Sequence, residues 1–179
     1  SVETMRQTIL AIRRLLAGKN ATFNNIQSRL RNVTNPPSPV FMTAAGPRMV
    51  ELAGEVADGV LISVGLNGLA MDAARRMFEA GARKAGRDPS SLEVAYAGRV
   101  QVEKDMETAL AVVRPMCAHW VMEPHRKPWL KEAGIEVSEM EIPEELKNLY
   151  PDIPHAENWE EAMRLTSFLS DEMVAQISE

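Results

Sequence analysis

The pattern of apolar and polar positions predicts a strand, a helix and a second strand within residues 39–67. Residues 40–45 form a short apolar run with β-branched and aromatic side chains, which favours a buried strand over a helix. Gly46-Pro47 suits a helix start, because proline has its φ set and needs no amide donor there. The apolar residues that follow share one helical face: Met49, Leu52, Ala53 and Val56. Residues 60–62 then indicate a second buried strand, parallel to the first.

The flanking segments show helical spacing as well. The chain opens with a helix that ends near Gly18 and carries one apolar face: Met5, Ile9, Ile12 and Leu16. Residues 19–38 are polar, rich in asparagine and closed by two prolines, which predicts an exposed loop. A long helix is expected from Asn67 to about Gly86, and small residues along its inner face, Gly81 among them, let it pack closely.

Alternation of apolar and other residues over 92–102 predicts the longest strand of the chain. Asp105 is placed to cap the next helix, which is expected to be bent or interrupted at Pro115. Its inward residues are expected to be Ala109, Val112, Val113, Met116 and Trp120. From residue 123 onward prolines separate short helical pieces. We therefore expect one domain over residues 1–179, with a β/α core at 39–122 and a helical excursion at 123–179.

The order of elements predicts an α/β protein with a parallel sheet, either doubly wound or part of a (β/α) barrel. In both folds, ligands bind at the carboxyl ends of the strands. The helix start after Gly46, together with Ser63 and the loop from Gly65 to Gly68, is a candidate cradle for the phosphate of a cofactor. In the alternative interpretation these glycines only turn the chain.

Composition narrows the classes of function. The 179 residues carry a net charge of −5 with scattered basic side chains, which argues against a nucleic-acid partner. The single cysteine excludes an internal disulfide, and no apolar run approaches the roughly 20 residues of a membrane span. We expect a cytoplasmic protein with neither a membrane nor a nucleic acid as partner.

Other residues with functional chemistry form weaker patterns. His119, His125 and His155 lack the spacing of a metal site, and no metal is expected. Cys117 is interpreted as a small buried hydrophobe. Arg99, towards the carboxyl end of the third strand, is either an anion contact or a member of a salt bridge. No residue is assigned a catalytic role.

Three segments carry a family resemblance: Ala-Ala-Gly-Pro at 44–47, Leu-Ala-Gly-Glu at 52–55 and Ala-Asp-Gly-Val-Leu-Ile at 57–62. They resemble a run in the luciferase-like flavin and deazaflavin oxidoreductases. Within that superfamily the chain looks most like the methylene-tetrahydromethanopterin reductase branch, which uses a reduced deazaflavin coenzyme. Residues 103–105 and 169–174 are similar to segments of the same branch.

The resemblance implies a partial (β/α)8 TIM barrel in which the three strands are the fifth, sixth and seventh. It implies that the chain is a fragment and that the other strands lie outside it. Residues Ala44, Ala45 and Gly46 resemble the backbone wall beside the cofactor, Ser63 resembles a phosphate-contacting hydroxyl, and Gly65 joins them from the cradle loop. The expected cofactor is a deazaflavin, with FMN as the alternative because Leu66 stands where some deazaflavin-dependent relatives have a phosphate-binding lysine.

The activity implied is hydride transfer to or from a small organic substrate, by a reductase or a monooxygenase, and the fragment alone is expected to lack full catalysis. One alternative is a non-catalytic flavin-binding or interaction module of the same barrel family. Another is an independent doubly wound enzyme that binds a nucleotide. The open edges of a partial barrel predict a homo-oligomer or strand pairing with another chain.

Overall fold

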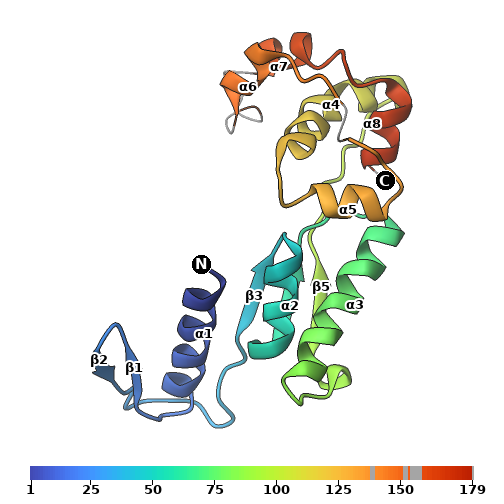
Figure 1. The fold of residues 1–179 in the computed structure, drawn as a ribbon. Helices are drawn as coiled ribbons and strands as arrows, with labels where there is room; N and C mark the ends of the chain where they lie inside the picture. Colours follow the sequence, from blue (N-terminus) through green and yellow to red (C-terminus); the bar gives the residue numbers. More distant parts are fainter. Residues whose placement is uncertain (138–139, 151–152, 154–158, 179) are drawn as a thin grey trace. The chain divides into compact units, whose positions relative to one another are not determined.

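The computed structural model describes residues 1–137, 140–150, 153 and 159–178. Contacts within the chain define two compact units (Figure 1). The first comprises Ser1–Ser63 with Ala74–Tyr96, and the second comprises Val64–Ala73 with Ala97–Glu179. The expected single domain, with its boundary between residues 122 and 123, stays a prediction.

The first unit is built on a three-stranded parallel sheet in the order β3 (Phe41–Ala44), β4 (Gly59–Ile62) and β5 (Glu93–Tyr96). Helix α2 (Pro47–Val56) connects β3 to β4 and packs against both strands (Figure 1). The side chains of Val50 and Ala53 on α2 and of Val60 and Ile62 on β4 are all fully buried. The predicted α/β fold with a parallel sheet is confirmed.

Helices α2 and α3 (Gly68–Lys84) approach each other closely at two glycines. A Cβ atom on Gly54 would lie 2.0 Å from the carbonyl oxygen of Phe78, and one on Gly81 would lie 2.0 Å from that of Glu51. Real Cβ atoms do not approach oxygen so closely, so both positions require glycine. The prediction that small residues let this helix pack closely is confirmed.

The opening helix, α1 (Val2–Leu16), packs against α2, and its Arg13 forms an ion pair and a hydrogen bond with residues next to the sheet. Arg13 donates a hydrogen bond to the carbonyl of Val56 at 3.0 Å and pairs with the carboxylate of Asp58 at 2.7 Å. The same carboxylate accepts a hydrogen bond from the backbone amide of Val40 at 2.9 Å. Asp58 therefore connects α1 to the start of β3.

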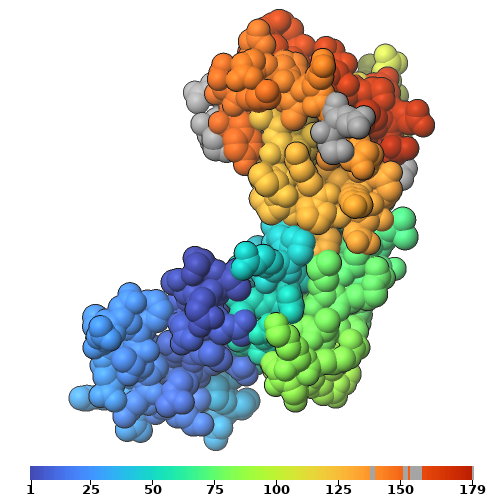
Figure 2. All heavy atoms as spheres, in the orientation of Figure 1, coloured from blue at the N-terminus to red at the C-terminus, as the bar shows by residue number. Residues whose placement is uncertain are grey.

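Residues 19–38 contain a β-hairpin, so the prediction of a plain loop was wrong here. Strands β1 (Ala21–Phe23) and β2 (Ile26–Ser28) pair antiparallel, and Figure 2 shows them in blue beside α1 in dark blue. Asn24 and Asn25 join them with positive φ angles of 48° and 63°. Such turns favour asparagine, which was the available signal, but strands of three residues are too short to show alternation.

The third strand is shorter than its sequence pattern predicts. β5 ends at Tyr96, which pairs with Ile62, the last residue of β4. Val100 and Val102 are 78% and 82% exposed. The prediction of a strand through residue 102 was wrong because a strand needs a neighbour to bond, and β4 offers none beyond Ile62.

Helices make up the second unit from residue 105 onward, among the residues that the structure describes. Helix α4 (Met106–Met122) is capped by Asp105, whose carboxylate accepts the amide hydrogen of Thr108 at 2.8 Å. The others are α5 (Lys127–Glu132), α6 (Glu144–Leu149), α7 (Trp159–Leu165) and α8 (Asp171–Ser178). No helix in the described part of the chain is long and apolar enough to cross a membrane.

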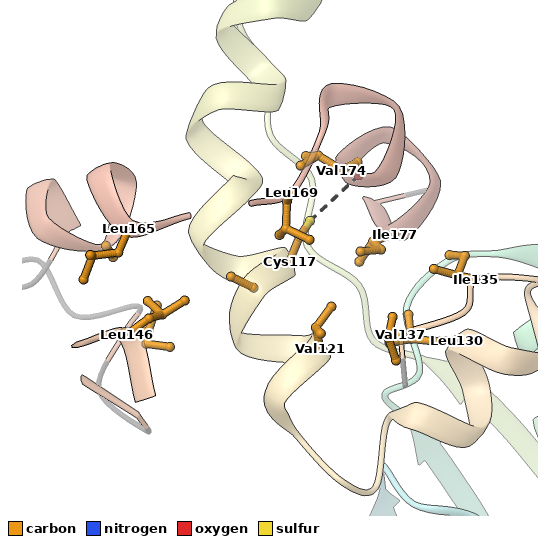
Figure 3. Packing of buried hydrophobic residues seen from close by; sticks show 13 residues of the cluster. Cys117, Val121, Leu130, Ile135, Val137, Leu146, Leu165, Leu169, Val174 and Ile177 are labelled. Atoms are coloured by element: carbon orange, nitrogen blue, oxygen red, sulfur yellow. Dashed lines mark hydrogen bonds between the residues drawn. The ribbon is translucent and has the colours of Figure 1, made fainter. Parts of the chain in front are cut away.

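The core of this unit lies between α4, α7 and α8. Figure 3 shows Cys117 and Val121 of α4 directed towards Leu169, Val174 and Ile177, and the Cys117 thiol donates a hydrogen bond to the carbonyl of Val174 at 3.8 Å. The helix is therefore buried on the face of Cys117, Ala118 and Val121. The residues predicted to face inward are only partly buried.

Candidate cofactor site

Four of the predicted site residues meet at one edge of the parallel sheet. Ala44 pairs with Ile62, and the amide of Ser63 donates a hydrogen bond to the Ala44 carbonyl at 2.9 Å. Ala44 is buried, whereas Ala45, Gly46 and Ser63 are partly exposed. The backbone of Ser63 therefore lies beside the end of β3, as expected from parallel strands, and the part of these residues in cofactor binding stays a prediction.

The start of α2 offers positive potential to an anion. Gly46 caps the helix with extended backbone, at φ −112° and ψ 153°. The amides of Met49 and Val50 both donate to the Gly46 carbonyl at 3.0 Å, and Pro47 has no amide hydrogen. The first turn contains no acidic residue but does contain Arg48, whose side chain is exposed. The helix dipole and this guanidinium would therefore favour an anion at the helix start, where no carboxylate of the first turn opposes them.

Gly65 belongs to the second unit and has a clear conformational role. Its φ is +88°, and a Cβ there would lie 3.2 Å from the Trp120 ring. The following helix, α3, is capped by Asn67, whose side-chain oxygen accepts the amides of Leu69 and Ala70 at 3.0 and 3.3 Å. Turn geometry alone thus explains Gly65, and its part in cofactor binding stays a prediction.

Leu66 is 41% exposed and packs over Gly98. A Cβ on Gly98 would lie 2.5 Å from the Leu66 side chain. Leu66, where a phosphate-binding lysine was considered, therefore packs its apolar side chain against the backbone at Gly98.

A cluster around Glu123 was missed in the sequence. The Glu123 carboxylate lies 3.3 Å from His119 and 3.7 Å from His125, and it pairs with Arg126. Burial lowers the pKa of His119, and its imidazole also stacks on the ring of Tyr150. The spacing of His119 and Glu123 on one helical face was the available signal. Arg126 lies 4.4 Å from the centre of the Trp120 ring, so the cluster holds that ring in place.

The remaining candidates stay without a catalytic role. Among the described residues, no group of histidine, cysteine, aspartate and glutamate is arranged to hold a metal ion, and His155 lies outside that part of the chain. Cys117 is 3% exposed, and burial raises the pKa of its thiol to about 12, which agrees with a small buried hydrophobe. Arg99 is exposed, and no ion pair joins it to a carboxylate that the structure describes.

A cavity of about 290 Å³ lies within the second unit. One wall is formed by a single face of α4: Val112, Val113, Met116 and Trp120. Trp159 of α7 and Arg99 complete the lining together with small or polar residues. Four of the five α4 residues predicted to face inward therefore line this cavity, and two of them, Val113 and Trp120, also pack against the core.

Comparison with known proteins identifies the family. The model of the luciferase-like monooxygenase family matches residues 1–178. The chain therefore belongs to the luciferase-like monooxygenase family.

The relatives found by sequence comparison include a reductase and a dehydrogenase. The chain is 35% identical over 119 residues to the 5,10-methylenetetrahydromethanopterin reductase of Methanolobus tindarius, covering 64% of this chain and 36% of that protein. It is 27% identical over 156 residues to the F420-dependent glucose-6-phosphate dehydrogenase of Nakamurella multipartita, covering 84% and 43%. The chain thus spans less than half the length of these relatives.

Solved structures show the same fold. The coenzyme F420-dependent tetrahydromethanopterin reductase of Methanopyrus kandleri aligns with a TM-score of 0.62 at 23% identity, over 97% of this chain and 48% of that chain. An F420-dependent secondary alcohol dehydrogenase in complex with an F420-acetone adduct aligns with a TM-score of 0.57 at 21% identity, over 76% and 45%. The observed α/β arrangement is therefore similar to the fold of an F420-dependent reductase.

Proposed function

We propose that this chain forms the cofactor-phosphate side of a luciferase-like (β/α)8 oxidoreductase, with β3, β4 and β5 as its fifth, sixth and seventh strands. The observation that carries the proposal is the parallel order β3-β4-β5 in a chain of this family, with Ser63 bonded to Ala44 at the carboxyl edge. The whole enzyme would act on a small organic substrate. The expected cytoplasmic location stays a prediction.

The described residues fit a phosphate-bearing cofactor. Ala44, Ala45 and Gly46 would form a wall of backbone beside it, and the Ser63 hydroxyl would donate to a phosphate oxygen. The start of α2, with the exposed Arg48, would add positive potential. The cofactor itself supplies the hydride chemistry, and this chain's residues bind it, orient it and exclude water.

A deazaflavin of the F420 type is the preferred cofactor. Two relatives carry that dependence in their names, the Nakamurella multipartita dehydrogenase and the F420-dependent hydroxymycolic acid dehydrogenase of Mycobacterium tuberculosis, the latter 35% identical over 92 residues. FMN is the alternative, supported by the absence of a cation at Leu66. Both cofactors carry a phosphate, which Ser63 and the start of α2 would hold.

Ser63→Ala is expected to weaken binding of coenzyme F420 to the purified chain by about 10-fold or more, because a hydrogen bond to a charged group contributes about 1.5–3 kcal/mol. Ser28→Ala, on the exposed strand β2, is the matched control and should bind as the unaltered chain does. Titrations followed by deazaflavin fluorescence, and by flavin fluorescence for FMN, measure both affinities.

The titration also separates the alternatives. Tighter binding of FMN than of F420 would replace the deazaflavin by the flavin. Failure of both to bind would contradict the cofactor site and favour an interaction module, for which the exposed Val100 and Val102 beyond β5 would be the pairing segment. Equal F420 affinity of Ser63→Ala and Ser28→Ala would remove Ser63 from the site.

A further inference from the structure

The cavity of the second unit has the size and lining of a small-molecule site. Its volume of about 290 Å³ is close to the roughly 300 Å³ at which ligand pockets begin. The α4 wall is apolar, with Val112, Val113 and Met116 partly rather than fully buried. These side chains would be buried further by an occupant, and burial of apolar surface favours binding.

Two indole rings contribute to the lining, Trp120 from α4 and Trp159 from α7. The Trp120 ring is held by Arg126, which lies 4.4 Å from its centre and is itself paired with Glu123. A ring fixed in this way loses little freedom when a ligand packs on it. Aromatic walls favour a flat aromatic body in the occupant.

The only charge in the described lining of the cavity is positive. Arg99 is its one charged side chain among the residues described, and no described carboxylate forms an ion pair with it. Cys117 adds no negative charge, because burial raises the pKa of its thiol to about 12. Because the whole chain has a net charge of −5, the guanidinium of Arg99 beside the cavity is not explained by a generally basic surface. It complements a carboxylate, which it can bind through two parallel hydrogen bonds.

We propose that this cavity binds a small organic anion with an aromatic body, of the class of aromatic carboxylates, with Arg99 on the carboxylate and Trp120 and Trp159 against the ring. The site lies wholly within the second unit and does not depend on the proposed cofactor. A chain that does not bind F420 could still bind an aromatic carboxylate in this cavity. Likewise, a chain that binds no aromatic carboxylate could still bind F420 at the proposed cofactor site.

Isothermal titration calorimetry of the full chain with 2-naphthoate and with its uncharged amide, 2-naphthamide, tests the charge. We expect 2-naphthoate to bind with one site and at least about 10-fold more tightly than the amide, in line with a charge-assisted hydrogen bond. Arg99→Gln should remove this preference and leave amide binding within about twofold. Arg76→Gln, exposed on α3 and outside the lining, is the matched control and should keep it. Equal binding of the two ligands, no binding of either, or an unaltered preference in Arg99→Gln would overturn the proposal.

Filling the cavity tests the location. Met116→Trp should abolish binding of both ligands while the far-ultraviolet circular dichroism of the chain is unchanged. Should that variant unfold, Val112→Phe places a smaller added volume on the same wall. A folded, filled variant that still binds 2-naphthoate with the original affinity would overturn the proposal.

Discussion

Gly54→Ala is expected to lower the free energy of unfolding of the chain by about 3 kcal/mol, the upper part of the range for overpacked interiors. The added Cβ would lie 2.0 Å from the carbonyl oxygen of Phe78 and 2.8 Å from the amide nitrogen of Ala82. Both atoms belong to the backbone of α3, so no side-chain rotation relieves the contact. Helix α2 would have to move away from α3, and its buried face would lose packing against β3 and β4. Urea denaturation followed by circular dichroism measures the loss.

Two further glycines on the same helices make the comparison specific. Gly81→Ala produces the same contact from α3 onto the carbonyl of Glu51 and should cost a similar amount. Gly68→Ala, at the start of α3, has no atom within 4 Å of the added Cβ. It should change stability by less than about 1 kcal/mol, towards stabilisation, since alanine is the better helix former. A Gly54→Ala chain that unfolds at the urea concentration of Gly68→Ala would contradict the close crossing of α2 and α3.

The purified chain is expected to turn over at least about 100-fold more slowly than a complete F420-dependent relative, even where it binds the coenzyme. At the described strand ends the proposed site offers Ala44, Gly46 and Ser63, none of which titrates near neutral pH. Proton transfer by a positioned acid or base contributes about 10²- to 10⁴-fold to a rate, so a site without one should fall below a complete relative by at least about 100-fold.

Deazaflavin absorbance with glucose 6-phosphate or a secondary alcohol as substrate measures turnover, with a full-length relative as the reference. The relatives' names supply these two substrates. A rate within about tenfold of the reference would show that this chain carries the acid-base groups itself, and would contradict the proposal that they come from the rest of a barrel.

The strand, helix and strand over residues 40–62 could be predicted because their signals are local. The predicted strand at 40–45 is observed as β3 (Phe41–Ala44), and the predicted strand at 60–62 as β4 (Gly59–Ile62). Gly46-Pro47 starts the helix as its chemistry requires. Because parallel strands place their carboxyl ends side by side, the neighbourhood of Ala44 and Ser63 followed from the same pattern.

The features that the sequence did not reveal depend on partners distant along the chain. Val100 and Val102 continue the alternation of β5, but the length of a strand is limited by its neighbour, and β4 stops at Ile62. The most buried face of α4 is set by where α7 and α8 pack, so Cys117 and Val121 are buried. The predicted inward face is only partly buried: it lines a cavity, and Val113 and Trp120 on it also contact the core.

The central claim is that the start of α2 and Ser63 hold the cofactor's phosphate. Proton–nitrogen correlation spectra of the isotopically labelled chain test it most directly, because they report each backbone amide separately. On addition of coenzyme F420, the largest shifts are predicted at the amides of Ala45, Gly46, Arg48 and Ser63, and they should shrink in Ser63→Ala. Saturable shifts that leave these four amides unmoved would contradict the account.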